Sequence, residues 1–146
     1  MIATREKPVT SPGTEALIDA MRKVERNITH TYGPFTLFGL FERESIPGRW
    51  DLVVSAPWLP EGREGIQIIA NYVARLPKAE AIQIARIVPL APESLPVRSI
   101  TEEVSIIDKG VFATGSTSIG NAEVVRGYIL VSQKGTPVPQ PLGKRG

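Results

Sequence analysis

The chain has 146 residues, of which 42% are hydrophobic and 22% are charged, and it contains no cysteine. This length and composition are typical of one globular domain, and the lack of cysteine excludes disulfide frameworks, cysteine-bound zinc, iron–sulfur centres and thiol nucleophiles. The formal charge is only +2, with Lys and Arg spread along the chain, so we do not expect nucleic acid to be a partner, because its binding needs a dense basic patch.

The first predicted element is a helix that follows an N-terminal arm, residues 1–13. Pro12 suits the first position of a helix, and apolar side chains then recur at spacings of four, three and four through residue 29, which is the period of a helix. These side chains are Leu17, Met21, Val24 and Ile28. The arm lacks the apolar run of a signal peptide, and no stretch approaches the roughly 18 apolar residues of a membrane span. We therefore expect a cytoplasmic protein with no membrane association.

Two strands joined by a turn are predicted next. Residues 35–44 are rich in aromatic side chains, and Ile46-Pro47-Gly48 is typical of a turn, because proline fixes φ and glycine accepts positive φ. The second strand follows, and its alternation separates two sets of residues. One face carries Trp50, Leu52, Val54 and Ala56, and the other carries Arg49, Asp51, Val53 and Ser55. The pattern predicts an antiparallel hairpin.

The second half of the chain alternates between apolar stripes and proline-rich breaks. In chain order we predict a helix at 60–76, a short helix at 77–81, a strand at 84–90, at most one helical turn within 96–103, a strand at 104–107, a tight turn at 108–110, and a hairpin of 111–119 with 123–133 that turns at Gly120-Asn121.

These elements predict the α+β class: a mixed, mainly antiparallel sheet with two main helices packed mostly on one face. Residues 14–134 are expected to form a single α+β domain. Residues 135–146 are rich in Pro and Gly and have no apolar face, so we interpret them as a C-terminal tail.

Asp51 is the strongest candidate for chemistry, because it is a carboxylate within an otherwise apolar strand. Its place on the second strand of a hairpin after a helix resembles the layout of many magnesium-dependent nucleases, although the acidic-x-Lys of their next strand is missing. A hard cation needs two or more oxygen ligands. The hypothesis is therefore a metal-dependent phosphodiester hydrolase with Asp51 as metal ligand. Glu42 or Glu44 would be the co-ligand, and Arg49 or Arg86 would steady a phosphate.

The competing interpretation is that Asp51 pairs with Arg49, Arg43 or a backbone donor and has no catalytic role. The single histidine, His30, falls at the end of the first helix, where its charge would complement the helix dipole. With no catalytic motif of high specificity, the sequence leaves open whether the protein is an enzyme.

We favour a non-enzymatic assembly or partner-binding module without a cofactor. Pro57, Trp58 and Leu59 are the candidate contact patch, because tryptophan is enriched at interfaces. A homo-oligomer is expected, most simply a dimer, and a protein partner remains an alternative.

Overall fold

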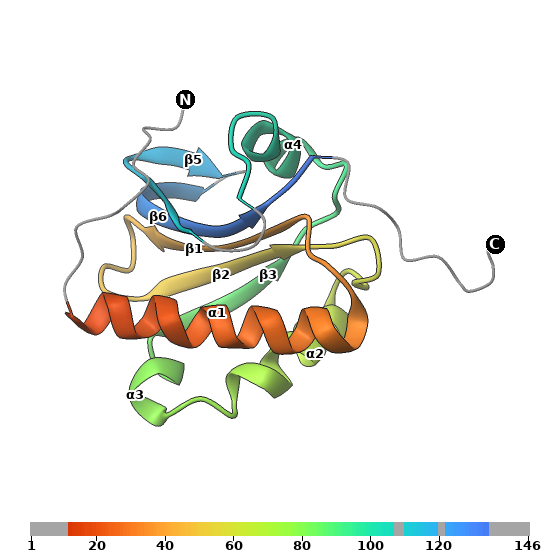
Figure 1. The fold of residues 1–146 in the computed structure, drawn as a ribbon. Helices are drawn as coiled ribbons and strands as arrows, with labels where there is room; N and C mark the ends of the chain where they lie inside the picture. Colours follow the sequence, from red (N-terminus) through yellow and green to blue (C-terminus); the bar gives the residue numbers. More distant parts are fainter. Residues whose placement is uncertain (1–11, 107–109, 120–121, 135–146) are drawn as a thin grey trace.

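The computed structural model describes residues 12–106, 110–119 and 122–134. These residues form a sheet of six strands with helices on both of its faces (Figure 1). In chain order the elements are α1 (Pro12–Tyr32), β1 (Leu37–Arg43), β2 (Trp50–Ser55), α2 (Arg63–Val73), α3 (Lys78–Ala81), β3 (Ile84–Pro89), α4 (Leu95–Thr101), β4 (Phe112–Thr114), β5 (Thr117–Ile119) and β6 (Ala122–Ser132).

The strand order is β3-β2-β1-β6-β4, and β5 also pairs with β6. Of these pairs, β2 and β3 run parallel and the others run antiparallel. Parallel neighbours need a crossover connection, which α2 and α3 supply between β2 and β3. The predicted α+β class, with a mixed and mainly antiparallel sheet, is confirmed.

The predicted hairpin is present as β1 and β2, which pair from Leu37 opposite Ser55 to Phe41 opposite Asp51. Gly48 in the connecting turn has a φ of 84°, a conformation that glycine adopts without strain. The predicted alternation along β2 is also present, because Leu52 belongs to one core cluster and Val53 to the other.

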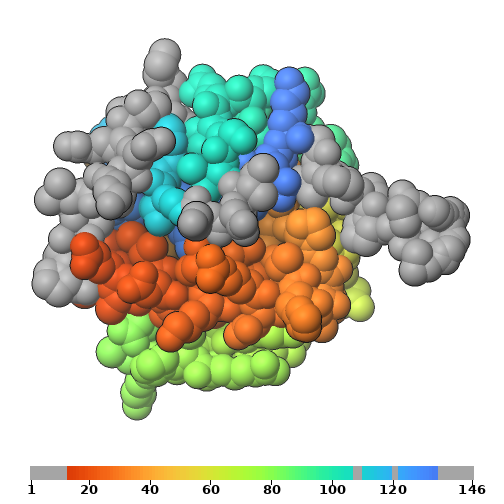
Figure 2. Space-filling view, in the orientation of Figure 1, coloured from red at the N-terminus to blue at the C-terminus, as the bar shows by residue number. Residues whose placement is uncertain are grey.

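The first core cluster lies between the sheet and the pair α1 and α2, on the lower side in Figure 1. The predicted stripe of α1 is buried there together with Ile69 and Val73 of α2, and on the sheet they meet side chains such as Phe38 and Leu52. The outer side of α1 is exposed, and α1 crosses the surface next to residues of α2 and α3 (Figure 2). Long helices thus close this face of the sheet.

The second core cluster lies on the opposite face, beneath α4 (Figure 1). Phe41 is fully buried here, and its ring lies against Gly39 and Gly127 on the two strands. A Cβ atom at Gly127 would clash with that ring and with Thr114 Oγ1, so the missing side chain makes room for the aromatic ring. With seven residues, α4 covers only part of the face.

Two elements differ from prediction. Residues 95–101 form a longer helix than the single turn expected, because a proline in the first turn starts it and Val97, Ile100 and Thr101 are buried at helical spacing. Of the strand predicted at 104–107, the described residues form only an isolated bridge between Ile106 and Ser132.

The second predicted hairpin is present, but its first strand is interrupted. Thr114 pairs with Gly127 and Thr117 pairs with Val124, so β4 and β5 share one register against β6 on either side of Gly115. The predicted arm up to residue 11, the turns at 108–109 and 120–121, and the tail 135–146 lie outside the described residues. Within the described ranges, no helix has both the length and the apolar character needed to cross a membrane.

Candidate functional site

A hollow of about 610 Å³ lies on the α4 face of the sheet. Its lining comes from five strands (β1, β2, β3, β5 and β6), from the β1–β2 turn, from the start of α4 and from the loop before it. The lining residues are Arg43, Glu44, Ser45, Asp51, Val53, Arg86, Val88, Leu90, Pro96, Ile119, Ala122, Glu123 and Val124. This volume suits a small-molecule ligand.

Asp51 lines this hollow and is only 4% exposed, and it is called the base of the hollow together with Arg43 and Arg86. Its Oδ2 accepts a hydrogen bond of 2.7 Å from Arg43 Nε, and Arg86 Nε lies 3.2 Å from the same oxygen. The sheet register brings the three together, because Arg86 on β3 lies opposite Asp51 on β2, while Arg43 continues β1 beyond Phe41, the residue paired with Asp51. One carboxylate therefore holds two guanidinium groups.

The terminal nitrogens of Arg43 and Arg86 make no hydrogen bond to any described residue. The Arg43 side chain is 21% exposed and the Arg86 side chain 51%. Two positive charges against one negative charge leave a formal surplus of +1 at the base. Guanidinium groups present a planar fork of donors that matches a carboxylate or a phosphate.

Two exposed carboxylates, Glu44 and Glu123, also line the hollow, and this pair is called its rim. The backbone joins these two residues, since Glu44 N donates to the Glu123 carbonyl at 2.9 Å. The hydroxyl of Ser118 donates to Glu123 Oε2 at 3.0 Å. The lining thus carries a positively charged group, the base, and a negatively charged group, the rim.

The remaining side chains of the lining, here called the walls, are largely apolar. They are formed by Val53, Val88, Leu90, Pro96, Ile119 and Val124. Several of these side chains are half-buried rather than buried, so an apolar group placed against them would remove more of their surface from water. The arrangement can bind a ligand with an anionic end and an apolar body.

The structure brings three of the predicted site residues to this hollow, namely Asp51, Glu44 and Arg86. Glu42 lies on the other face of the sheet, because it adjoins Phe41, which pairs with Asp51, and side chains alternate along a strand. Arg49 is exposed and donates to the Ile84 carbonyl at 3.1 Å, away from the hollow lining.

Glu42 belongs to a separate polar cluster that is closed by its own contacts. Its Oε1 lies 2.5 Å from Arg126 Nε, and its Oε2 accepts a hydrogen bond of 2.6 Å from Gly48 N. The Arg126 guanidinium lies over the Trp50 ring at 5.5 Å from the ring centre. Both carboxylate oxygens are occupied, so this cluster fixes the end of the hairpin.

Within the ranges that the structure describes, no group of three His, Cys, Asp or Glu residues is placed to hold a metal ion. The carboxylates of Asp51 and Glu42 point to opposite faces, and Asp51 already carries two cationic partners.

The predicted contact patch is partly internal. Leu59 is 8% exposed and belongs to the first core cluster, while Pro57 and Trp58 are half-buried. Trp58 Nε1 donates to the Pro34 carbonyl at 2.9 Å, and its ring stacks on Tyr32 with centres 5.2 Å apart. Tyr32, at the end of α1, is the more exposed aromatic side chain of this pair, at 42%.

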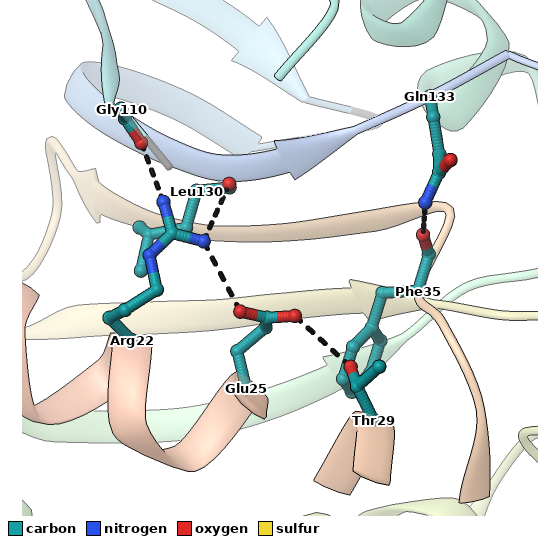
Figure 3. Close-up of polar contacts among 7 residues, drawn as sticks. All are labelled: Arg22, Glu25, Thr29, Phe35, Gly110, Leu130 and Gln133. Atoms are coloured by element: carbon teal, nitrogen blue, oxygen red, sulfur yellow. Dashed lines mark hydrogen bonds and ion pairs between the residues drawn. The ribbon is translucent and has the colours of Figure 1, made fainter. Parts of the chain in front are cut away.

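A third polar cluster joins α1 to the edge of β6, as Figure 3 shows. Arg22 donates to the carbonyls of Leu130 at 3.0 Å and Gly110 at 2.6 Å, and it pairs with Glu25 at 3.2 Å. Thr29 donates to the second oxygen of Glu25 at 3.0 Å. Leu130 lies between the part of β6 that pairs with β4 and Ser132, which pairs with Ile106. The Arg22 guanidinium group therefore binds a carbonyl at a break in strand pairing, and its role is structural.

Sequence reasoning missed the apolar walls of the hollow and treated Arg43 only as an ion-pair partner. A signal was present, because alternation along residues 84–90 places Arg86, Val88 and Leu90 on one face. The contributions of Pro96 and Ile119 had no such signal, since they depend on tertiary packing.

Comparison of the chain with protein-family models, with curated proteins and with solved structures finds no match.

Proposed function

We propose that this protein is a non-catalytic binding module and that the hollow on the α4 face is its ligand site. The observation that carries the proposal is the base of the hollow, where buried Asp51 holds Arg43 and Arg86 while their terminal nitrogens make no hydrogen bond to the described residues. Pockets of this kind, with apolar walls and a few convergent polar groups, are typical of small-molecule sites.

The same contacts favour binding over metal-dependent hydrolysis. A hard cation needs several oxygen ligands, whereas Asp51 Oδ2 is shared between two guanidinium groups and the described residues place no group of three His, Cys, Asp or Glu to hold a metal ion. The co-ligand predicted at Glu42 is held on the opposite face by Arg126 and Gly48. Asp51 is thereby suited to orienting the two arginines rather than to holding a cation.

A filled hollow tests the proposal. Val88→Trp places a large side chain on a half-buried wall position, and Ile82→Trp is the matched control on a residue that is 62% exposed and does not line the hollow. A panel of small metabolites is screened by thermal shift. A ligand at one hundred times its dissociation constant adds about 2.7 kcal/mol to the free energy of unfolding.

We expect a stabilising ligand whose effect is lost in Val88→Trp and kept in Ile82→Trp. A panel without a hit, or a hit that Val88→Trp leaves unchanged, would contradict the hollow as the binding site. Stabilisation by Mg²⁺ or Mn²⁺ that Asp51→Asn abolishes would favour the phosphodiester hydrolase instead.

We also propose that the protein acts as a homodimer in the cytoplasm. The support for assembly is the exposed face of Tyr32 stacked on Trp58 at the end of α1, since exposed aromatic side chains are common at interfaces. Light scattering should give a dimer mass for the unmodified chain and a monomer mass for Tyr32→Glu. A monomer mass for the unmodified chain would contradict the assembly, and fractionation of cells tests the location.

A further inference from the structure

We infer that the hollow on the α4 face selects an amphipathic monoanion, specifically a carboxylate with an apolar body. This inference rests on the proposed function, because it names the class of ligand for the same site. It follows from three features of the lining taken in turn: the charge at the base, the charge at the rim and the apolar walls.

The base requires an anionic group. Arg43 and Arg86 approach Asp51 through their Nε atoms, at 2.7 Å and 3.2 Å, so the terminal nitrogens of both remain available for a ligand. The surplus of one positive charge is complementary to one negative charge. A ligand carboxylate between the two guanidinium groups would complete an alternating set of two cations and two anions.

The rim limits the charge of the ligand. Glu44 and Glu123 line the same hollow and are exposed, so each disfavours further negative charge nearby. A phosphate monoester has a second pKa of about 6 and is mainly dianionic above neutral pH. The rim therefore favours a carboxylate over a phosphate monoester of the same length.

The walls require an apolar body. Val88, Leu90, Pro96 and Ile119 are half-buried around the base, and they offer no hydrogen-bonding side-chain group. A hydrocarbon chain that lies across them gains about 25 cal/mol for each Å² of apolar surface removed from water. A small inorganic anion would gain none of this.

Isothermal titration calorimetry with four eight-carbon probes below their micelle concentrations tests the inference. The probes are octanoate, octyl phosphate, 1-octanol and octylammonium, and the buffer is held at about pH 8. We expect octanoate to bind most tightly. The inference is overturned if 1-octanol or octylammonium binds as tightly as octanoate, or if no probe binds.

Variants of the base test the placement of the carboxylate. Arg86→Met removes one guanidinium group and should lower the affinity for octanoate by about 10- to 100-fold. This is the usual effect of losing hydrogen bonds to a charged group. The matched control is Arg98→Met, because Arg98 lies on α4, is 59% exposed and does not line the hollow. Because salt and solvent screen this exposed charge, Arg98→Met should change the affinity for octanoate by no more than about twofold. If Arg86→Met does not fold, Arg86→Lys replaces it, because lysine keeps the positive charge but lacks the planar donor pair of the guanidinium group. Arg86→Lys should also weaken octanoate binding.

Variants of the rim test the selection against dianions. The double variant Glu44→Gln, Glu123→Gln should raise the affinity for octyl phosphate on the order of fivefold and the affinity for octanoate by less. The reason is that repulsion between the two glutamates and a probe scales with the charge of the probe. An unchanged ratio between the two probes would contradict selection by the rim.

The failures of the two proposals are distinguishable. If Val88→Trp abolishes octanoate binding but Arg86→Met binds octanoate as the unmodified chain does, the hollow is the ligand site and the carboxylate inference is wrong. If a ligand other than these probes stabilises the protein and depends on Val88, the binding function stands and its ligand belongs to another class.

Discussion

The two faces of the sheet each carry a buried carboxylate, yet the surroundings of these carboxylates differ. On the face covered by α1 and α2, Glu42 is held by Arg126 and by the backbone of Gly48. On the α4 face, Asp51 holds two guanidinium groups at the base of a hollow. The direct partners explain the difference, because both oxygens of Glu42 are bound, whereas Asp51 Oδ2 meets two arginines whose terminal nitrogens make no hydrogen bond to the described residues. The covering helices differ as well, since α1 has 21 residues and α4 has seven.

The largest expected contrast between the faces is in stability. Phe38→Ala on the α1 face should lower the free energy of unfolding by about 3–5 kcal/mol, because Phe38 is fully buried and packs edge-to-face on Phe35. Leu90→Ala, on the half-buried wall of the hollow, should cost about 1 kcal/mol. Urea unfolding with equal slopes gives both values. Equal losses would show that the hollow is as closed as the core.

The next effect concerns the packed part of the α4 face. Gly127→Ala should lower the free energy of unfolding by about 1–3 kcal/mol, because the new Cβ meets the Phe41 ring. The control is Gly13→Ala in α1, where nothing lies within 4 Å of the new atom and stability should hold or rise by up to about 1 kcal/mol. Phe41→Leu in the Gly127→Ala chain should restore part of the loss. If it restores nothing, the clash is not the cause.

A smaller effect separates the two carboxylates. Glu42→Gln and Asp51→Asn should each cost about 1–2 kcal/mol in unfolding free energy, since each removes a charged hydrogen-bond acceptor. Only Asp51→Asn leaves two guanidinium groups facing each other without a counter-charge, so its cost should fall at high salt and in the Arg86→Met background. Denaturation at low and high salt measures this. The same salt dependence in both variants would remove the distinction.

The smallest effect sharpens the comparison within the α4 face. Ser55 and Ser132 are both paired with Leu37 from either side and are both fully buried. Ser132 Oγ donates to the Val104 carbonyl at 2.7 Å, whereas Ser55 Oγ has no hydrogen-bond partner among the residues that the structure describes. Ser132→Ala should therefore cost about 1 kcal/mol, and Ser55→Ala should be neutral or slightly stabilising. Thermal unfolding of the two variants tests this, and a larger loss for Ser55→Ala would reveal a partner for its hydroxyl.

Local pattern was enough to predict much of the fold. The apolar stripe of α1 and the alternation along β2 depend on residues close in sequence, and both are present in the structure. The turn at Gly48 follows from the conformational freedom of glycine. Such features need no knowledge of distant contacts, so a sequence can specify them.

The candidate site was only partly predictable, because it depends on register between distant strands. Asp51 could be singled out as a carboxylate in an apolar strand, but its pairing with Arg86 requires the parallel alignment of β2 and β3. The hollow also requires Pro96 of α4 and Ile119 of β5 to line the same space, which tertiary packing decides. Glu42 is predicted as a co-ligand of Asp51 across the hairpin, but Phe41 is the residue that pairs with Asp51, so alternation along β1 places Glu42 on the other face.

The central position of β6 has a consequence for the order of folding. Residues 122–132 pair with β1 on one side and with β4 and β5 on the other. The edge of β1 that faces β6 therefore has no partner strand until almost the whole described chain has been synthesised. Contacts of such sequence separation close slowly, and an unpaired strand edge invites association with other chains. Until residues 122–132 have been synthesised, β1 therefore has no β6 to pair with along that edge.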